Sequence, residues 1–170
     1  YGPTALAARV AAFSKKYDRV VVKVPDSAGS AGNISIFSKD VRDLSLSELR
    51  QILVTRLHDL GWRQRFPILV QVWDCDVIGD PSVQLWIPEL PSGSPILEGV
   101  FGQMVEGLAG EFVGASSLDL PSEIIDQIAD EALRLARVLQ HCGYYGRCSF
   151  DAVLSGRTYS DAALHWIECN

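Results

Sequence analysis

The feature that most restricts the fold is a run of β-branched residues, Val20-Val21-Val22-Lys23-Val24, that ends at Pro25. Valine favours strands, and proline lacks the N–H group that a further ladder hydrogen bond would need. A loop of small and polar residues follows at 26–33, and the alternation of Ile34-Ser35-Ile36-Phe37 then indicates a second strand. The sequence therefore predicts an early β-hairpin with a long tip rich in glycine and serine.

Three helices are expected along the chain. Thr4 is a suitable N-cap for an amphipathic helix that we expect to end near Asp18. Ser45-Leu46-Ser47-Glu48 has the form of a capping box, and the helix that follows it is expected to end at Gly61. A longer amphipathic pattern, which begins with a proline and ends with a glycine, covers residues 121–143.

The remaining apolar segments have the patterns of strands. A polar turn at 74–81 joins two of them into a second expected hairpin, and residues 88–94 are the best candidate for an internal linker. Strands separated by helices, without a strict βαβ alternation, favour an α+β fold with largely antiparallel sheets. The expected strands are residues 67–73, 82–87, 96–106, 111–115, 145–154 and 164–170.

The charge balance excludes some classes of partner. With 15 Lys and Arg against 21 Asp and Glu the formal net charge is -6, and there is no basic stripe, so we expect no nucleic-acid binding. No apolar run reaches the ~18 residues of a membrane span, and residues 1–10 lack a signal-peptide pattern, which favours a cytoplasmic protein without a membrane partner. The 4 cysteines form no C-x-x-C pair and are expected to be reduced packing residues, and the 3 histidines are expected to be structural.

The first candidate site is Lys23 with the loop that follows it. Gly29 and Gly32 carry no Cβ, so the backbone N–H groups of this loop, which also contains Ser27 and Ser30, are able to approach phosphate oxygens closely. Lys23 adds a positive charge. Because the lysine precedes the glycines, this is not a Walker A arrangement. The alternative is a flexible hairpin tip with a solvated lysine.

The second candidate site is at the end of the sequence. Strand alternation places Arg147, Ser149 and Asp151 on one face, and it likewise places Trp166, Glu168 and Asn170 on one face. If the two strands pair, Asp151, Glu168 and Asn170 converge. Two carboxylates and an amide oxygen are a hard donor set suited to Mg²⁺. The alternative is a solvated polar face of a sheet.

A third candidate is the end of the strand at 67–73. Its apolar residues give way to Asp74 and Asp76. Backbone groups at the strand end, Gln71-Val72-Trp73, are suited to a base edge, and a following acid is suited to ribose hydroxyls. The alternative is a core strand followed by a turn.

Taken in this order, the three sites resemble those of the ATP-grasp superfamily. The match uses Lys23 and its loop, the strand at 67–73, and one acid followed by E-x-N, which here are Asp151 and Glu168-Cys169-Asn170. The sequence around this pattern, Gly146-Arg147-Cys148-Ser149-Phe150-Asp151 with His165-Trp166-Ile167-Glu168-Cys169-Asn170, is most similar to the ATP-grasp domains of pheganomycin-type peptide ligases.

The resemblance implies an α+β fold of two lobes that hold ATP in a cleft between them. We expect a lid lobe at 1–90 and a metal-binding lobe at 91–170 that is truncated at its C-terminus. The implied activity is ATP-dependent ligation of a carboxylate to an amine through an acyl phosphate, with ATP and Mg²⁺ as cofactors and an amino acid or peptide as substrate. The alternatives are another ATP-grasp ligase or carboxylase, and an ATP-binding domain without turnover.

The resemblance also implies roles for individual residues. Lys23 would contact the nucleotide phosphates, and Gly29, Ser30 and Gly32 would belong to the lid loop above them. The segment Gln71-Val72-Trp73 would be the hinge beside adenine, with Asp74 or Asp76 near the ribose.

Asp151, Glu168 and Asn170 would be the Mg²⁺ ligands. Many members of the superfamily have an arginine two residues before the first metal-binding acid. Here Ser149 has that position, and Arg147 lies further back on the same face. Arg147 is therefore the candidate for stabilising the acyl phosphate.

Overall fold

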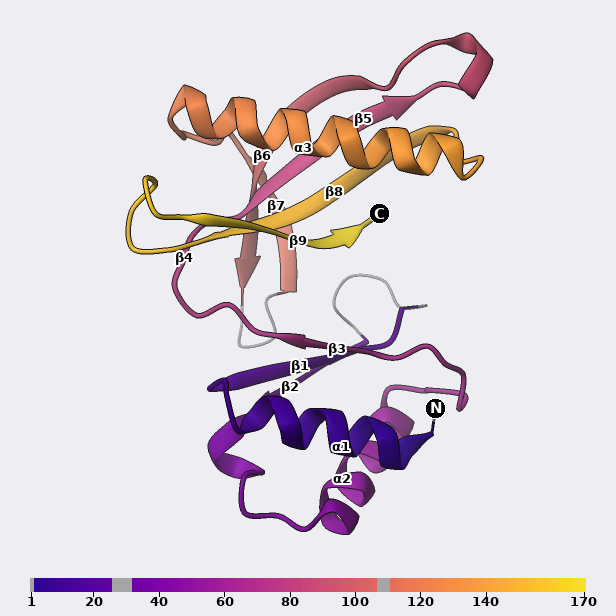
Figure 1. Ribbon diagram of the computed structural model, residues 1–170, viewed down its shortest axis with the longest axis vertical. Coiled ribbons are helices and arrows are strands. Elements are labelled where there is room, and N and C mark those ends of the chain that lie inside the picture. The colour runs from indigo at the N-terminus through magenta and orange to yellow at the C-terminus, as the bar shows by residue number, and fades with distance from the viewer. Residues whose placement is uncertain (1, 26–31, 107–110) are drawn as a thin grey trace. The chain divides into compact units, whose positions relative to one another are not determined.

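The computed structural model describes residues 2–25, 32–106 and 111–170, and the chain divides into two compact units (Figure 1). Unit 1 comprises residues 1–75 with 106–112, and unit 2 comprises residues 76–105 with 113–170. Each unit has its own hydrophobic core, so each is described separately below.

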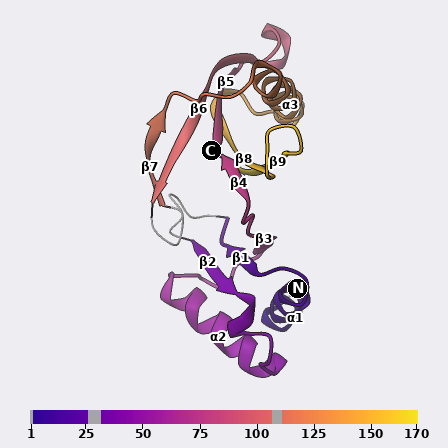
Figure 2. The ribbon, with the colours of Figure 1, turned by 90° about the vertical axis from the view of Figure 1, so that its left-hand side faces the viewer.

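Unit 1 is a three-stranded antiparallel sheet covered on one side by two helices. The strand order is β2-β1-β3, with β1 at Arg19–Lys23, β2 at Asn33–Phe37 and β3 at Leu69–Val72. The helices α1 (Pro3–Ser14) and α2 (Leu46–Asp59) lie on the same side of this sheet (Figures 1 and 2), and the short 3₁₀ helix η1 (Ser38–Asp40) follows β2. β1 and β2 form the predicted first hairpin. The buried core residues are Leu6, Ala7, Val10, Val22, Ile34, Ile36, Val41, Leu49, Leu53, Leu57 and Trp62.

The capping box of α2 is present, whereas the bounds of α1 differ from those predicted. Ser45 Oγ accepts a hydrogen bond from the N–H of Glu48, and the Glu48 carboxylate accepts one from the N–H of Ser45. These bonds lower the pKa of Glu48. The first helix begins at Pro3 rather than after a Thr4 cap, because proline at the first helical position has no N–H to leave unpaired. It ends at Ser14, four residues early, since the chain has already turned towards β1.

Unit 2 is a six-stranded sheet with one long helix. The strand order is β4-β8-β5-β6-β7, and β9 pairs with β8. The helix α3 (Ser122–His141) lies along one face of the sheet (Figure 2). The other elements are β4 (Val77–Gly79), β5 (Pro81–Ile87), η2 (Leu90–Ser92), β6 (Ile96–Glu106), β7 (Glu111–Ser116), β8 (Gly146–Ser155) and β9 (Ala163–Cys169). The buried core residues are Val83, Leu85, Ile87, Ile128, Ala132, Ala136, Cys148, Phe150 and Leu154.

The predicted second hairpin is wrong. β3 is instead part of the unit 1 sheet, where it pairs with β1: Val70 lies opposite Val22, and Val72 lies opposite Val20. β5 pairs instead with β6 and β8 in unit 2. Its inward side chains are fully buried beneath α3. The segment 76–90, which was expected to belong to the first lobe, therefore lies in unit 2.

A buried glutamine anchors the end of α3. Gln140 is 5% exposed, and its side-chain amide donates hydrogen bonds to the carbonyls of Pro88, at 2.9 Å, and Gly93, at 2.8 Å. These acceptors flank η2, so two hydrogen bonds join the connection between β5 and β6 to the C-terminal end of α3.

Together the two units confirm the expected α+β class with antiparallel sheets. No helix in the described part of the chain is long and apolar enough to span a membrane.

Candidate functional site

The predicted carboxylate and amide cluster forms on one face of the β8–β9 pair. Asp151 lies directly opposite Glu168 in the strand register. Asn170 and Ser149 exchange backbone hydrogen bonds of 2.8 and 2.9 Å, which extends the pairing beyond β9. The side-chain amide of Asn170 donates to Asp151 Oδ2 at 2.9 Å. Pairing of the two strands therefore brings all three predicted metal ligands to the same part of the sheet.

A β-bulge in β9 is what turns Glu168 towards Asp151. Asp151 lies opposite Glu168, whereas Ala152 lies opposite Trp166, so the register of the two strands shifts by one residue at Ile167. The prediction that Trp166 and Glu168 share a face is wrong for this reason. Trp166 points to the core, where its ring is 6.0 Å from that of Phe150, and its indole N–H donates to Glu131 of α3.

Ser82 is a member of this cluster that the sequence analysis missed. It lies opposite Asp151 on β5, and its hydroxyl donates to Asp151 Oδ1 at 2.7 Å. Both oxygens of the Asp151 carboxylate are thus held, one by Ser82 and one by Asn170. The alternation of β5 indicates that Ser82 faces away from the core, but only the pairing with β8 identifies its partner.

The donor set of this cluster fits a hard divalent cation. Among the described residues, no three His, Cys, Asp or Glu side chains gather around a point as metal ligands do. A cation here would instead be held by Asp151, Glu168 and the amide oxygen of Asn170. In this structure the amide nitrogen of Asn170 faces Asp151, and a half-turn about the last side-chain bond would present the oxygen. Carboxylate and amide oxygens are the ligands that Mg²⁺ prefers, and Glu168 is exposed.

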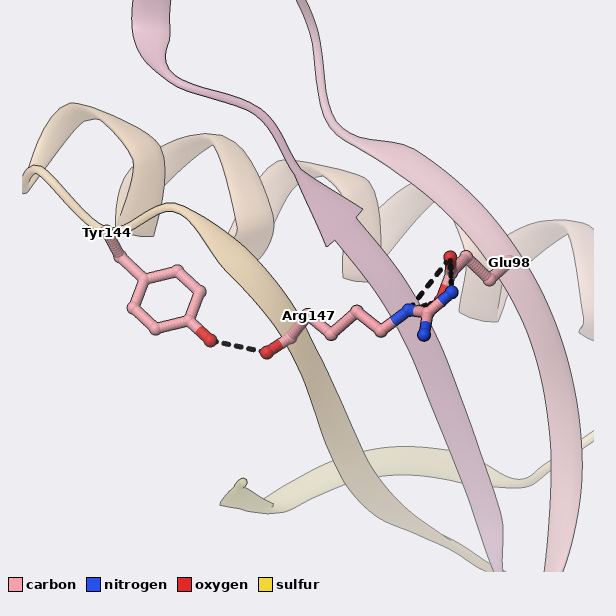
Figure 3. A network of polar contacts seen from close by, with 3 residues as sticks. All are labelled: Glu98, Tyr144 and Arg147. Atoms are coloured by element: carbon pink, nitrogen blue, oxygen red, sulfur yellow. Dashed lines mark hydrogen bonds and ion pairs between the residues drawn. The ribbon is translucent and has the colours of Figure 1, made fainter.

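Arg147 lies on β8, as Asp151 does, but its side chain pairs with Glu98 and not with the cluster. Its guanidinium donates to both carboxylate oxygens of Glu98 on β6 at 3.2–3.3 Å, and its carbonyl accepts from the hydroxyl of Tyr144 (Figure 3). Glu98 is the unpaired residue of a second β-bulge, in β6. Among the described residues, no hydrogen bond or ion pair joins Arg147 to Asp151. The arginine side chain is 77% exposed.

In unit 1, Lys23 and Gln71, two of the predicted nucleotide residues, lie on the same face of the sheet. Val21 on β1 pairs with Gln71 on β3, and the side chain of Lys23 lies on the same face of the sheet, two residues further along β1. The other face of the sheet packs against α1 and α2. Lys23 and Gln71 are both half-buried. Gly32 is buried, and its carbonyl accepts from the N–H of Val24 at 3.0 Å. Ser27, Gly29 and Ser30 lie outside the described residues.

The hinge segment has a neighbour that the sequence analysis also missed. The guanidinium carbon of Arg19 lies 3.7 Å from the ring centroid of Trp73, and the Trp73 N–H donates to the Arg19 carbonyl at 3.1 Å. The side chain of Val72 lies on the opposite face of β3 from that of Gln71. Of the candidate ribose acids, Asp74 is half-buried in unit 1, whereas Asp76 is exposed in unit 2.

All four cysteines are free, but only one is a packing residue. Cys148 is 7% exposed, and burial together with the charge of the Cys169 thiolate raises its pKa to about 11. Cys75, Cys142 and Cys169 are exposed, so the expectation that all four are packed is wrong for these three.

Comparison with known proteins identifies the fold. No family model matches the sequence, and neither does any curated protein sequence. Solved structures do match, and they show that the chain has the fold of ATP-grasp enzymes.

One of these structures is the biotin carboxylase domain of Hydrogenobacter thermophilus 2-oxoglutarate carboxylase, with a TM-score of 0.68, 15% identity and 96% of this chain covered. A second is D-alanyl-alanine synthetase A of Vibrio cholerae, with a TM-score of 0.62, 10% identity and 98% covered. A third is carboxyaminoimidazole ribonucleotide synthase of Aspergillus clavatus, with a TM-score of 0.62, 14% identity and 96% covered. The chain spans 33%, 45% and 37% of the lengths of these three chains, respectively.

Proposed function

We propose that this chain is the nucleotide- and metal-binding part of an ATP-dependent ligase that joins a carboxylate to an amine. The observation that carries the proposal is the cluster of Asp151, Glu168 and Asn170, with Ser82 and Asn170 holding the Asp151 carboxylate. The fold neighbours support it, because one is a D-alanyl-alanine synthetase and others were solved with ATP or with ADP and magnesium. The sequence resemblance to pheganomycin-type ligases favours a peptide or amino acid as substrate.

Each unit has a defined part in the proposed reaction. In unit 1, Lys23 places a positive charge at the phosphates of ATP, and Gln71 and the backbone of Trp73 contact adenine. In unit 2, Asp151, Glu168 and Asn170 hold Mg²⁺, which when bound neutralises negative charge on the phosphate oxygens. These residues act by positioning and by charge stabilisation, which supply most of the catalysis in phosphoryl transfer.

The proposed chemistry has two steps. An oxygen of the substrate carboxylate attacks the γ-phosphorus, the bond to the β-phosphate oxygen breaks, and ADP leaves. The amine then attacks the acyl carbon, loses a proton, and inorganic phosphate leaves with the electron pair of the acyl–oxygen bond. Water must be kept from the acyl phosphate between these steps, because hydrolysis would release the substrate unchanged.

A carboxylase is the second candidate function. The biotin carboxylase domain that shares the fold was solved with bicarbonate. In that case bicarbonate would take the place of the organic carboxylate in the first step, and the roles proposed for Lys23 and Asp151 would be unchanged.

The test measures metal and nucleotide binding together with ADP release. Glu168→Gln and Asp151→Asn each remove one negative charge from the cluster, and Glu123→Gln on the exposed start of α3 is the matched control. We expect the first two variants to lose Mn²⁺-dependent ATP binding and ADP release, and the control to keep both. If Glu168→Gln showed Mn²⁺-dependent ATP binding at the wild-type level, Glu168 would not be a metal ligand.

The substrate requirement separates the candidate functions. ADP release that needs an amino acid or peptide and an amine supports the ligase, whereas release that needs only bicarbonate and an acceptor supports the carboxylase. Tight Mg²⁺-ATP binding without ADP release under any of these conditions would support a binding domain without turnover.

A further inference from the structure

Arg19 connects the three strands of the unit 1 sheet through its side chain and its backbone. Its guanidinium carbon lies 3.7 Å from the ring centroid of Trp73 and 4.9 Å from that of Phe37, and its Nε donates to Ser35 Oγ. Its carbonyl accepts the N–H of Trp73 at 3.1 Å. Trp73 is therefore joined to Arg19 both by stacking and by a backbone hydrogen bond.

This stack lies on the sheet face that carries the proposed nucleotide residues. Arg19 lies two residues before Val21 and four before Lys23 on β1, so the three side chains share one face. Trp73 follows Val72, the last residue of β3, and has the same orientation as Gln71. The stack is thus adjacent along β3 to the glutamine that is proposed to contact adenine.

Arg19 contacts the Trp73 ring at a position outside the hydrophobic core of unit 1. Trp73 is half-buried, lies beyond the end of β3, and does not belong to the hydrophobic core of the unit. A guanidinium stacked on an indole is attracted by the negative face of the ring, and the attraction grows when the pair is shielded from water. Ser35 accepts a hydrogen bond from the Nε of Arg19, which orients the guanidinium over the ring.

We propose that Arg19 is a positioning residue for the base of the nucleotide: it holds the Trp73 ring as a rigid wall beside Gln71, against which adenine binds. This inference rests on the proposed function, because it assumes that ATP binds to this face of the sheet. The inference assigns the base and the phosphates of the nucleotide to different residues. Arg19 acts on the base through Trp73 and does not contribute to binding of the phosphates, which is assigned to Lys23.

The experiment compares two ligands that share phosphates but differ in the base. Dissociation constants of ATP and of inorganic triphosphate are measured by calorimetry with Mg²⁺ for the purified wild-type protein, Arg19→Gln, Trp73→Phe and the double variant. Arg50→Gln on the exposed face of α2 is the control. Arg19→Lys, which keeps the charge but loses the planar fork, serves as a milder variant if Arg19→Gln is unstable.

We expect Arg19→Gln to weaken ATP binding about three- to ten-fold and to leave triphosphate binding unchanged. In the Trp73→Phe background it should have a much smaller effect, because the ring on which it acts is altered. Equal losses for ATP and triphosphate would indicate a general distortion of unit 1 and overturn the inference. Additive effects of the two substitutions would overturn it as well. Failure of the wild-type protein to bind either ligand would instead refute the proposed function, and the inference with it.

Discussion

The hydrogen bond from Ser82 to Asp151 allows a specific prediction about metal affinity. Ser82→Ala removes a hydroxyl that donates to Asp151 Oδ1 at 2.7 Å and leaves the other carboxylate oxygen bonded to Asn170. In the proposed site this hydroxyl orients a metal ligand without touching the metal. Groups of this kind typically contribute 10- to 100-fold, as an order of magnitude, to metal affinity.

The structure places the expected effect just below that range. A hydrogen bond to a charged group contributes ~1.5–3 kcal/mol when it is shielded from water. Ser82 and Asp151 are only half-buried, so that water can replace part of the lost bond. We therefore expect the binding free energy of Mn²⁺ to fall by about 1 kcal/mol, which corresponds to a dissociation constant about five-fold higher.

The assay is Mn²⁺ binding followed by electron paramagnetic resonance, with Ser149→Ala as the control. Ser149 lies on the same strand and face as Asp151, but no hydrogen bond of its side chain to a described residue is present. Ser82→Ala should bind Mn²⁺ about five-fold more weakly with a nearly unchanged melting temperature, and Ser149→Ala should bind as the wild type does. Unchanged affinity in Ser82→Ala, or an equal loss in both variants, would refute the assigned orienting role.

Three further predictions concern stability and reactivity. Gln140→Leu removes a buried amide that donates to the carbonyls of half-buried Pro88 and exposed Gly93, and it should cost about 1–2 kcal/mol, seen as a melting temperature lowered by about 2–8 °C; an unchanged melting temperature would contradict the anchoring role. Cys148, with its pKa raised to about 11, should react with iodoacetamide at pH 8 far more slowly than exposed Cys142, and peptide mass spectrometry would reveal equal labelling if this is wrong. Burial raises the pKa of Asp80, so the folded state binds its proton more tightly than the unfolded state, and stability is lost as pH rises through the raised pKa. Asp80→Asn should therefore stabilise the protein at pH 7 and give a smaller gain at pH 4.5, and a gain in urea unfolding that is independent of pH would count against this account.

Local sequence patterns predicted the local structure well. The capping box at Ser45 and Glu48, the hairpin of β1 and β2, and the long helix α3 all follow from signals within one element. The pairing of β8 with β9, and hence the convergence of Asp151 with Asn170, also followed because these strands are neighbours in the sequence.

Two of the contacts that the sequence did not reveal join distant segments. Ser82 and Asp151 are 69 residues apart, and nothing in either segment specifies that β5 will pair with β8 rather than with β3. Arg19 and Trp73 are joined only because β3 returns to the edge of β1. The bulge at Ile167 was missed because alternation assumes that the register with the neighbouring strand is unbroken.

This bulge has a consequence for how the end of the chain tolerates changes in length. Trp166 and Glu168 face opposite sides of the sheet although one residue separates them, which an uninterrupted strand would not allow. A version of the chain that lacks Ile167 would make them consecutive, and consecutive residues of a regular strand also face opposite sides. Deletion of this one residue, at which the register shifts, should thus keep the indole inside and the carboxylate outside. Deletion of His165, in the regular part of the register, would move both side chains to the opposite faces as long as Leu164 stays opposite Leu154.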